Sequence, residues 1–388
     1  MRKFLIFIVV LIVIVAAVGA FLLFAPTQQS GDIRALIAEV PGTAEAFAIV
    51  PRAAAFDVKV RANPITRAAL AKWTERHPLP PAWTLGGTDL VAWRSGDEIS
   101  YCVRADVVRA FLIRMLGSKV LINATAQPSF DSATVAQILD LTSRLPRGDA
   151  LVVQRQSSRG AYPPIGRPAV TAVVVTPAEI TLTSVAAGFS PPEGGLKAAP
   201  TQKFPRSALL SAAFTQPPRV VADLNRIFGA KVSSLFDEGG MISIYNIDTR
   251  KLLPRPLGVI VLPNDPQRRA IVDSFRKAEA IGIRARTAEI GGNFVLSFDD
   301  SIDQYQKDAF DPAPVANQWS MRIDPQRLVP ILNDLGDNLG LRIAAPRLFR
   351  SARDLAAWIG GLEQAKVIEA TDSGQGAEET LQVRIVAK

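Results

Sequence analysis

The feature that most constrains this chain is an uninterrupted apolar run from Phe4 to Phe24, which is preceded by Arg2 and Lys3. At ~1.5 Å per helical residue, a run of this length spans roughly the ~30 Å hydrocarbon core of a bilayer. The sequence therefore predicts an N-terminal transmembrane helix with a short linker, within residues 1–30. A cleaved signal peptide is the alternative, but the small-residue site at Val18-Gly19-Ala20 is followed by apolar residues rather than polar ones.

The charges beside this run predict its orientation. Arg2 and Lys3 precede it and no basic residue follows before Arg34, so the N-terminus is expected in the cytoplasm. We expect a single-pass protein of the bacterial inner membrane, with its C-terminal bulk extracytoplasmic. The membrane is then an integral partner through the span from Phe4 to Phe24, and an envelope protein, a lipid or a glycan is a candidate further partner.

Composition and charge narrow the class of protein. The chain is 48% hydrophobic and 21% charged, as a folded protein is, and Cys102 is its only cysteine, which excludes an intrachain disulfide. The net charge of +8 is dispersed, since residues 31–160 carry 16 basic and 12 acidic side chains and residues 161–388 carry 26 and 24. Without a dense basic stripe that includes aromatic residues, no nucleic-acid partner is predicted.

A local pattern of strand, turn and helix recurs along the chain. Residues 319–323 alternate as in a strand, and Asp324-Pro325 then suits a helix start, because Asp can accept a free N–H and Pro at the first helical position sacrifices none. The tetrapeptide Asp-Pro-Gln-Arg occurs twice, from Asp265 and from Asp324. An internal repeat and independent helix starts both explain this identity.

The order of the predicted elements indicates the fold class. Hairpins are predicted for residues 90–94 with 99–103, 170–176 with 179–185, 286–290 with 293–298, and 367–370 with 381–386. Residues 46–123 and 207–290 each follow the order strand, helix, strand, strand, helix, strand. That is the ferredoxin-like βαββαβ order, so we predict an α+β protein with two tandem antiparallel-sheet units and extra hairpins.

The predicted domain boundaries follow from the Pro/Gly-rich stretch between the two units. We predict a first α+β domain at residues 31–190, a linker at 191–205 and a second α+β domain at 206–388.

The residues give no catalytic signature. His77 is the only histidine, which excludes histidine-cluster metal sites, and no nucleophile elbow accompanies it. Cys102 has no histidine to activate it and is predicted to be a small core residue. Ser274 and Lys277 have SxxK spacing without its companion motifs. No catalytic, cofactor-binding or metal-binding residue is therefore predicted, and no cofactor.

Two groups of arginines are candidates for binding a partner. Arg155, Arg159 and Arg167 lie in a loop at residues 154–168, which is otherwise a long hairpin connection. Arg347, Arg350 and Arg353 lie beside the apolar stripe of a predicted helix at 346–362, which otherwise docks on its own sheet.

The N-terminal segments suggest a family. Val40-Pro41 leads into the strand at 47–50, Asn63-Pro64-Ile65-Thr66-Arg67-Ala68 opens a helix, and the hairpin at 90–103 follows. With the anchor before them, these segments resemble the uncharacterised bacterial membrane-anchored envelope proteins grouped as a domain of unknown function, the three-three-five-two type. The resemblance implies an envelope protein and supplies no activity.

Two functions from different classes are consistent with the sequence. The first is a non-enzymatic binding or structural envelope protein, as the absence of catalytic motifs suggests. The alternative is an envelope hydrolase that uses carboxylates and serines in an arrangement without a recognisable motif. A deep pocket with convergent polar groups would distinguish the enzyme from the binding protein.

Overall fold

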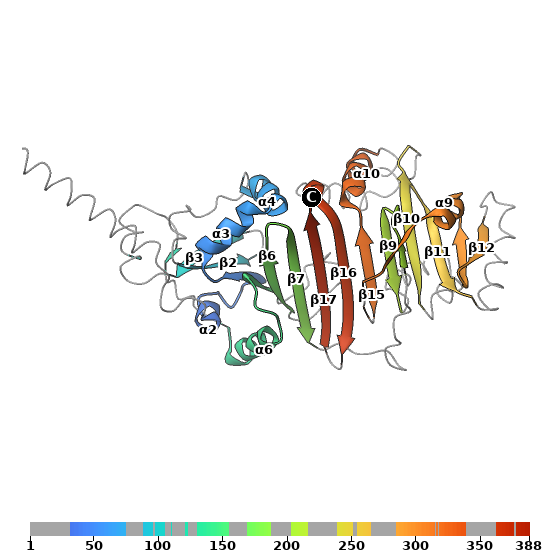
Figure 1. Ribbon diagram of the computed structural model, residues 1–388. Coiled ribbons are helices and arrows are strands. Elements are labelled where there is room, and N and C mark those ends of the chain that lie inside the picture. The colour runs from blue at the N-terminus through green and yellow to red at the C-terminus, as the bar shows by residue number, and fades with distance from the viewer. Residues whose placement is uncertain are drawn as a thin grey trace, which may run out of the picture. The chain divides into compact units, whose positions relative to one another are not determined.

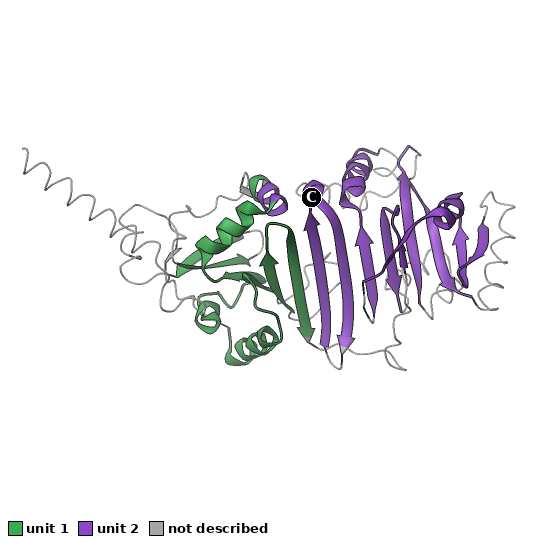
Figure 2. Cartoon of the chain, in the orientation of Figure 1, with its two compact units in different colours: residues 1–63, 70–187 green, residues 64–69, 188–388 purple. Residues whose placement is uncertain are grey.

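The computed structural model describes residues 32–74, 88–95, 98–104, 110, 121–122, 130–154, 169–187, 203–215, 239–250, 254–264, 285–314, 316, 318–338, 362–375 and 378–388 (Figure 1). The chain divides into two compact units (Figure 2). Unit 1 comprises residues 1–63 and 70–187, and unit 2 comprises residues 64–69 and 188–388. The predicted domain boundaries at 190, 191–205 and 206 stay predictions, because residues 188–202 lie outside the described part.

Unit 1 is built on one mostly antiparallel sheet. Its strands are β1 (Ala46–Val50), β2 (Asp89–Ser95), β3 (Glu98–Arg104), β4 (Leu121–Ile122), β5 (Ala150–Gln154), β6 (Ala169–Val175) and β7 (Glu179–Ala187). They lie in the order β7-β6-β5-β1-β2-β3-β4, and only the pair β3 and β4 is parallel. The helices are α2 (Ile33–Ile37), α3 (Ala53–Ala62) and α6 (Ser132–Ser143). Helix α4 (Pro64–Thr74) is divided, because its residues 64–69 are counted with unit 2.

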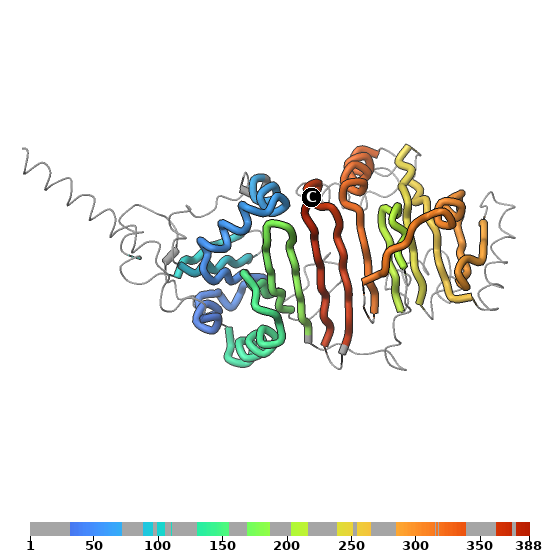
Figure 3. The backbone as a smooth tube through the Cα atoms, viewed as in Figure 1, coloured from blue at the N-terminus to red at the C-terminus, as the bar shows by residue number. Residues whose placement is uncertain are grey.

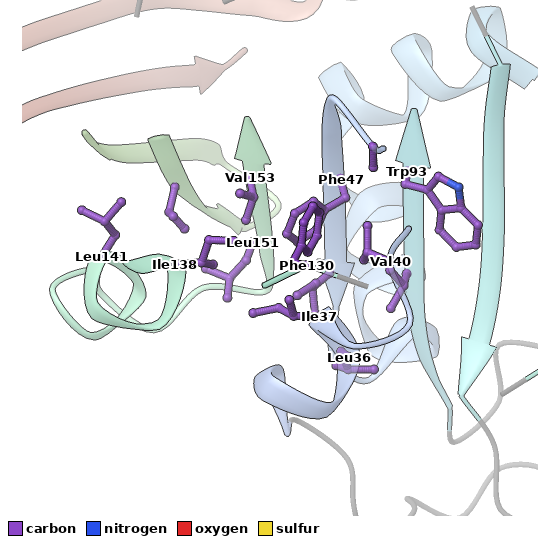
Figure 4. Close-up of a cluster of buried hydrophobic side chains, with 14 of the residues drawn as sticks. Leu36, Ile37, Val40, Phe47, Trp93, Phe130, Ile138, Leu141, Leu151 and Val153 are labelled. Carbon is purple, nitrogen blue, oxygen red and sulfur yellow. The ribbon is translucent and has the colours of Figure 1, made fainter. Parts of the chain in front are cut away.

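Helices cover both faces of this sheet. On one face, Phe47, Leu151 and Val153 form a buried cluster with Ile138 and Leu141 of α6 (Figure 4). On the other face, Val50 and Ala150 pack with Ala53 and Phe56 of α3. Successive side chains of a strand point to opposite faces of the sheet. Complete burial of a large aliphatic side chain contributes about 1.5–3 kcal/mol to the stability of the fold. The two apolar faces therefore hold the helices on the sheet.

Unit 2 has a larger sheet and a small second one. Its strands are β8 (Lys203–Pro205), β9 (Leu210–Phe214), β10 (Gly240–Asp248), β11 (Arg255–Pro263), β12 (Arg286–Ile290), β13 (Asn293–Ser297), β14 (Phe310–Pro312), β15 (Trp319–Ile323), β16 (Ala365–Gln375) and β17 (Glu378–Ala387). The main sheet has the order β12-β13-β11-β10-β9-β15-β16-β17, and β14 pairs with β8. The helical elements are α9 (Ser301–Lys307), α10 (Pro325–Asp337) and the 3-10 turn η4 (Leu362–Gln364).

The core of unit 2 lies mainly under α9. Phe204 and Val295, on strands, pack with Ile302 and Tyr305 of that helix. Helix α10 begins as predicted, because the Asp324 side chain accepts hydrogen bonds from the N–H groups of Gln326 and Arg327 at 3.0 and 3.3 Å. The start of α10 is thus fixed by local chemistry that the sequence contains.

The two sheets share the order of six strands, because β3-β2-β1-β5-β6-β7 in unit 1 corresponds to β11-β10-β9-β15-β16-β17 in unit 2. The register corresponds as well. Ile49 is the last but one residue of β1 and lies opposite Leu151 of β5. Ala213 is the last but one residue of β9 and lies opposite Ser320 of β15. Leu151 in turn lies opposite Ala172 of β6, and Ser320 lies opposite Thr371 of β16. Residues of unit 1 and unit 2 can therefore be matched position by position.

The predicted ferredoxin-like α+β class is wrong. In that arrangement the strands joined by a helix run parallel with another strand between them, but β1 pairs directly and antiparallel with β2, with Val50 opposite Leu90. In the same way β9 pairs directly and antiparallel with β10. Each unit is instead dominated by a wide antiparallel sheet. All four predicted hairpins are confirmed, as β2–β3, β6–β7, β12–β13 and β16–β17.

The expectation of a membrane anchor is also corrected. No helix in the part of the chain that the structure describes is long and apolar enough to cross a bilayer, and the segment from Phe4 to Phe24 lies outside that part. The transmembrane helix, the single-pass inner-membrane location and the integral membrane partner that followed from it are therefore withdrawn. These three expectations rested on the length of the apolar run from Phe4 to Phe24, and no element that the structure describes supports them.

Candidate functional site

The structure does not test the predicted arginines. Arg155, Arg159 and Arg167, like Arg347, Arg350 and Arg353, lie outside the described residues. Among the residues that are described, no group of three or more His, Cys, Asp and Glu side chains could hold a metal ion. A candidate site must therefore be found from the geometry itself.

A row of polar side chains crosses β15, β16 and β17 on one face of the unit 2 sheet. Arg322 lies opposite Glu369, and Glu369 lies opposite Arg384. A parallel row of Ser320, Thr371 and Gln382 lies beside it on the same face. We call these six residues the polar face. Figure 3 shows β16 and β17 side by side along their whole length.

Ion pairs connect the polar face to the neighbouring strand β14. Arg322 Nη1 lies 2.8 Å from Asp311 Oδ2, and Arg206 Nε lies 2.7 Å from Asp311 Oδ1. Hydrogen bonds from Arg322 and Arg206 lower the pKa of Asp311 below its usual value. At the other end of the row, Arg384 Nη1 lies 3.5 Å from Glu369 Oε2, which is a looser pair.

The arginines of this network face solvent more than its acids do. The side chains of Arg206 and Arg384 are 63% and 51% exposed, whereas those of Asp311 and Glu369 are 25% and 26% exposed. Three guanidinium groups, counting Arg322, also outnumber the two carboxylates. The polar face therefore presents positive charge to its surroundings.

The equivalent row in unit 1 is entirely apolar. In unit 1 the row consists of Trp93, Phe47, Val153, Val170 and Val185, and in unit 2 of Ser243, Ser211, Arg322, Glu369 and Arg384. The three valines are buried beside α6, which packs on β6 and β7. In unit 2 the helix α9 packs on β11, β12 and β13 instead. The shared strand arrangement therefore does not require a polar row at these positions.

An acid pair, Asp372 and Glu379, lies on the opposite face of the same strands. Asp372 is 3% exposed and lies opposite Trp319. Burial first, and then the negative charge of Glu379, raise the pKa of Asp372 to about 7, while hydrogen bonds from Trp319 and Ser373 oppose the rise. Such a strongly raised carboxyl pKa marks a candidate functional group.

A serine and an aspartate also meet in unit 2. The Ser207 hydroxyl donates to Asp308 Oδ2 at 2.6 Å, and Ser207 N–H donates to the same carboxylate at 3.2 Å. Gln304 Nε2 donates to Ser207 Oγ at 3.1 Å. Every one of these bonds ties the turn after β8 to α9 or to its C-cap residue, Asp308. The arrangement locks a turn and supplies no base of the histidine or lysine type to activate the serine.

The single cysteine is a core residue, as predicted. Cys102 is completely buried, and its Sγ donates to Glu39 Oε2 at 3.2 Å. Burial is the main cause that raises the pKa of Glu39, while Arg104, with Nε 3.9 Å from Glu39 Oε1, acts in the opposite direction. The thiol lies in the main apolar cluster of unit 1.

Comparison of the sequence with protein-family models finds no match, and neither curated proteins nor solved structures give a significant match. The resemblance to the three-three-five-two type of envelope proteins therefore stays a prediction.

Neither the polar face nor the acid pair was predicted from the sequence. The predicted hairpin at 367–370 and 381–386 already places Glu369 opposite Arg384. Extension of the same register by a few residues places Glu379 diagonal to Asp372. The pairing of β15 with β16, which adds Arg322 and Trp319, has no local signal in the sequence.

Proposed function

We propose that the protein is a non-enzymatic binding protein, and that the polar face of unit 2 binds an acidic segment of a protein partner. One observation carries this proposal. Matched strand positions hold buried valines in unit 1 and Arg322, Glu369 and Arg384 in unit 2. Since the fold tolerates an apolar row there, the charged row is best explained by what it contacts.

Charge supports an acidic partner. Arg206 and Arg384 are the most exposed groups of the network, and arginine pairs with carboxylates through two parallel N–H donors. Arg384 and Glu369 are 3.5 Å apart, so a carboxylate of the partner can compete with Glu369 for the guanidinium. Exposed pairs of this kind contribute about 0.2–1 kcal/mol each and are screened by salt. The expected binding is weak and sensitive to ionic strength.

The hydrolase alternative has less support. The hydroxyl and the N–H of Ser207 both bind Asp308 in a structural turn. The Ser297 hydroxyl also donates to a carboxylate, Asp299 Oδ1, at 3.1 Å, two residues further along the chain. No observation at this turn favours catalysis over binding.

A defined peptide tests the proposal. Full-length protein is titrated into fluorescein-labelled oligo-glutamate and, separately, oligo-lysine, and binding is followed by fluorescence anisotropy. We expect binding of oligo-glutamate only. The double variant Arg322→Gln, Arg384→Gln should raise its Kd by about 5- to 30-fold, from about 0.5–1 kcal/mol lost at each position.

Arg286→Gln is the matched control. Arg286 is an exposed arginine of unit 2 on β12, where it pairs with Asp300 and Asp303 at 2.7 and 3.1 Å. Its replacement removes the same charge from a different surface and should leave the Kd within about twofold. Equal weakening by the control and the double variant would show that net charge, and not the polar face, governs binding.

A further inference from the structure

The charges of the polar face alternate along one row. Arg322, Glu369 and Arg384 are successive partners on β15, β16 and β17, so the row is positive, negative and positive across the sheet. All three side chains reach solvent, from 26% exposed for Glu369 to 51% for Arg384. Glu369 repels an approaching carboxylate, so attraction of acidic groups alone does not account for its place between two arginines. The alternation is a pattern that a partner can match.

The sheet fixes the spacing of this pattern. Neighbouring strands lie about 4.8 Å apart, so the backbone of Arg322 is about 4.8 Å from that of Glu369 and about 9.6 Å from that of Arg384. In an α-helix, residues i+3 and i+4 lie on the same face as residue i at about 4.5–6 Å along the axis, and i+7 lies there at about 10.5 Å. In an extended segment the residues of one face are about 6.7 or 13 Å apart. Of these two conformations, the helix matches both spacings.

The matched strands of unit 1 hold a helix at this place. The row there consists of Val153, Val170 and Val185. These valines lie in one buried cluster with Ile138 and Leu141 of α6. Helix α6 packs on β6 and β7, which correspond to β16 and β17 of unit 2. The strand arrangement that both units share therefore accommodates a helix on these strands.

The described helices of unit 2 pack elsewhere or only beside the row. Helix α9 lies on the same face as the row, but it packs on β11, β12 and β13. Helix α10 contacts β16, and its buried Val329 and Leu332 pack with Leu362, which precedes that strand. The charged side chains keep their exposure to solvent, whereas the valines of unit 1 are buried. The place that α6 occupies in unit 1 is thus accessible to a partner in unit 2.

We infer that the partner segment is an α-helix with acidic residues at i and i+7 and a basic residue at i+3 or i+4. The inference rests on the proposed function, since it specifies the acidic segment that the polar face binds. Arg322 keeps its bond to Asp311 and has further N–H donors for one acid of the helix. The other acid takes the guanidinium of Arg384, and Glu369, which held it at 3.5 Å, pairs with the basic residue instead. Each charge of the row then has an opposite charge on the helix.

Two helical peptides of equal composition test the spacing. The first is a labelled alanine-based peptide of about 20 residues, long enough to form a helix, with Glu at i, Lys at i+4 and Glu at i+7. The second has its second Glu at i+5, which turns this side chain by about 200° to the far side of the helix. With helicity matched by circular dichroism, anisotropy with the full-length protein at low ionic strength should give a Kd about 2- to 5-fold lower for the first peptide.

A third peptide, in which Gln replaces the Lys, tests the role of Glu369. The wild type should bind the Lys peptide about 2- to 5-fold more tightly than the Gln peptide, and Glu369→Gln should abolish this preference. The control Glu363→Gln removes an exposed acid of η4, outside the polar face, and should retain the preference. This cycle isolates the contact between Glu369 and the Lys from the overall charge of the protein.

Oligo-glutamate separates failure of this inference from failure of the proposed function. Binding of oligo-glutamate together with equal Kd values for the i+7 and i+5 peptides would overturn the helical pattern and leave the proposed function standing. The same conclusion would follow if the wild type showed no preference for Lys over Gln, or if Glu369→Gln retained it. Absence of binding by every acidic peptide would overturn both.

Discussion

Replacement of Asp372 by asparagine should remove a measurable part of the pH dependence of stability. The carboxyl is neutral more readily in the folded state than in the unfolded state, because burial and Glu379 raise its pKa from 3.8 to about 7. The folded protein therefore binds more protons than the unfolded chain between these values. By linkage, this group makes stability fall as pH rises from about 4 to about 7, and contributes nothing further above that range.

The size of the effect follows from the shift. Three pKa units at about 1.36 kcal/mol each give an upper value of ~4 kcal/mol. The proton belongs to the pair and not to Asp372 alone, so we expect about 2 kcal/mol between pH about 4 and about 7. Asparagine has nearly the same shape and no charge to bury, so it should stabilise the protein at neutral pH and leave it nearly unchanged at acidic pH.

Urea denaturation followed by circular dichroism, with EDTA present, measures this difference across the pH range. The free energy of unfolding of the variant minus that of the wild type should grow steadily to about 2 kcal/mol as pH rises from about 4 to about 7. Asp311→Asn is the control, because its pKa is lowered and its contribution is lost only as pH falls below about 4. A wild type minus Asp372→Asn difference that is flat between pH about 4 and about 7 would refute the reasoning.

Three further predictions concern packing. Gly258→Ala should destabilise unit 2 by about 2–4 kcal/mol in urea denaturation, since the new Cβ would lie 2.3 Å from the Ser243 carbonyl oxygen. The control Gly291→Ala should cost only about 1 kcal/mol, because Gly291 has φ +58° but open space around it. Ile138→Ala should cost about 2–5 kcal/mol and Ile138→Val about 0.5–1.5, because this side chain is buried in the main cluster of unit 1; equal losses would place it outside a packed core. The Cys102 thiol should react with a disulfide reagent only in denaturant, and rapid stoichiometric labelling of the native protein would contradict its burial.

Local features of the fold were predictable from the sequence. The hairpin of β2 and β3 follows from alternating residues around a short turn, and its predicted pairing is observed with Leu90 opposite Val103. The start of α10 follows from Asp324 and Pro325, which supply the cap and the first helical residue. In both cases the residues that determine the structure are neighbours in the chain.

The arrangement of the sheets was not predictable in the same way. β1 lies between β2 and β5, and Ile49 lies opposite both Val91 and Leu151. A strand of alternating residues fits several neighbours equally well, and the choice depends on packing across the whole sheet. The ferredoxin-like prediction required parallel crossovers from β1 to β2 and from β9 to β10, whereas both pairs are direct and antiparallel.

The candidate site was missed for the same reason. Arg322, Glu369 and Arg384 form one row only because β15 pairs with β16, and the chain between these strands is long. The contrast with Val153, Val170 and Val185 needs in addition the register of unit 1. No single stretch of sequence contains either relation.

The central claim is that the charged row of unit 2 serves binding and not folding. The most direct test replaces Arg322, Glu369 and Arg384 together by valine, the residue found at the matched positions of unit 1. Stability in urea and anisotropy with labelled oligo-glutamate are then measured on the same full-length protein. We predict a folded variant that no longer binds the peptide. Loss of folding, or a folded variant that binds the peptide as the wild type does, would contradict the claim.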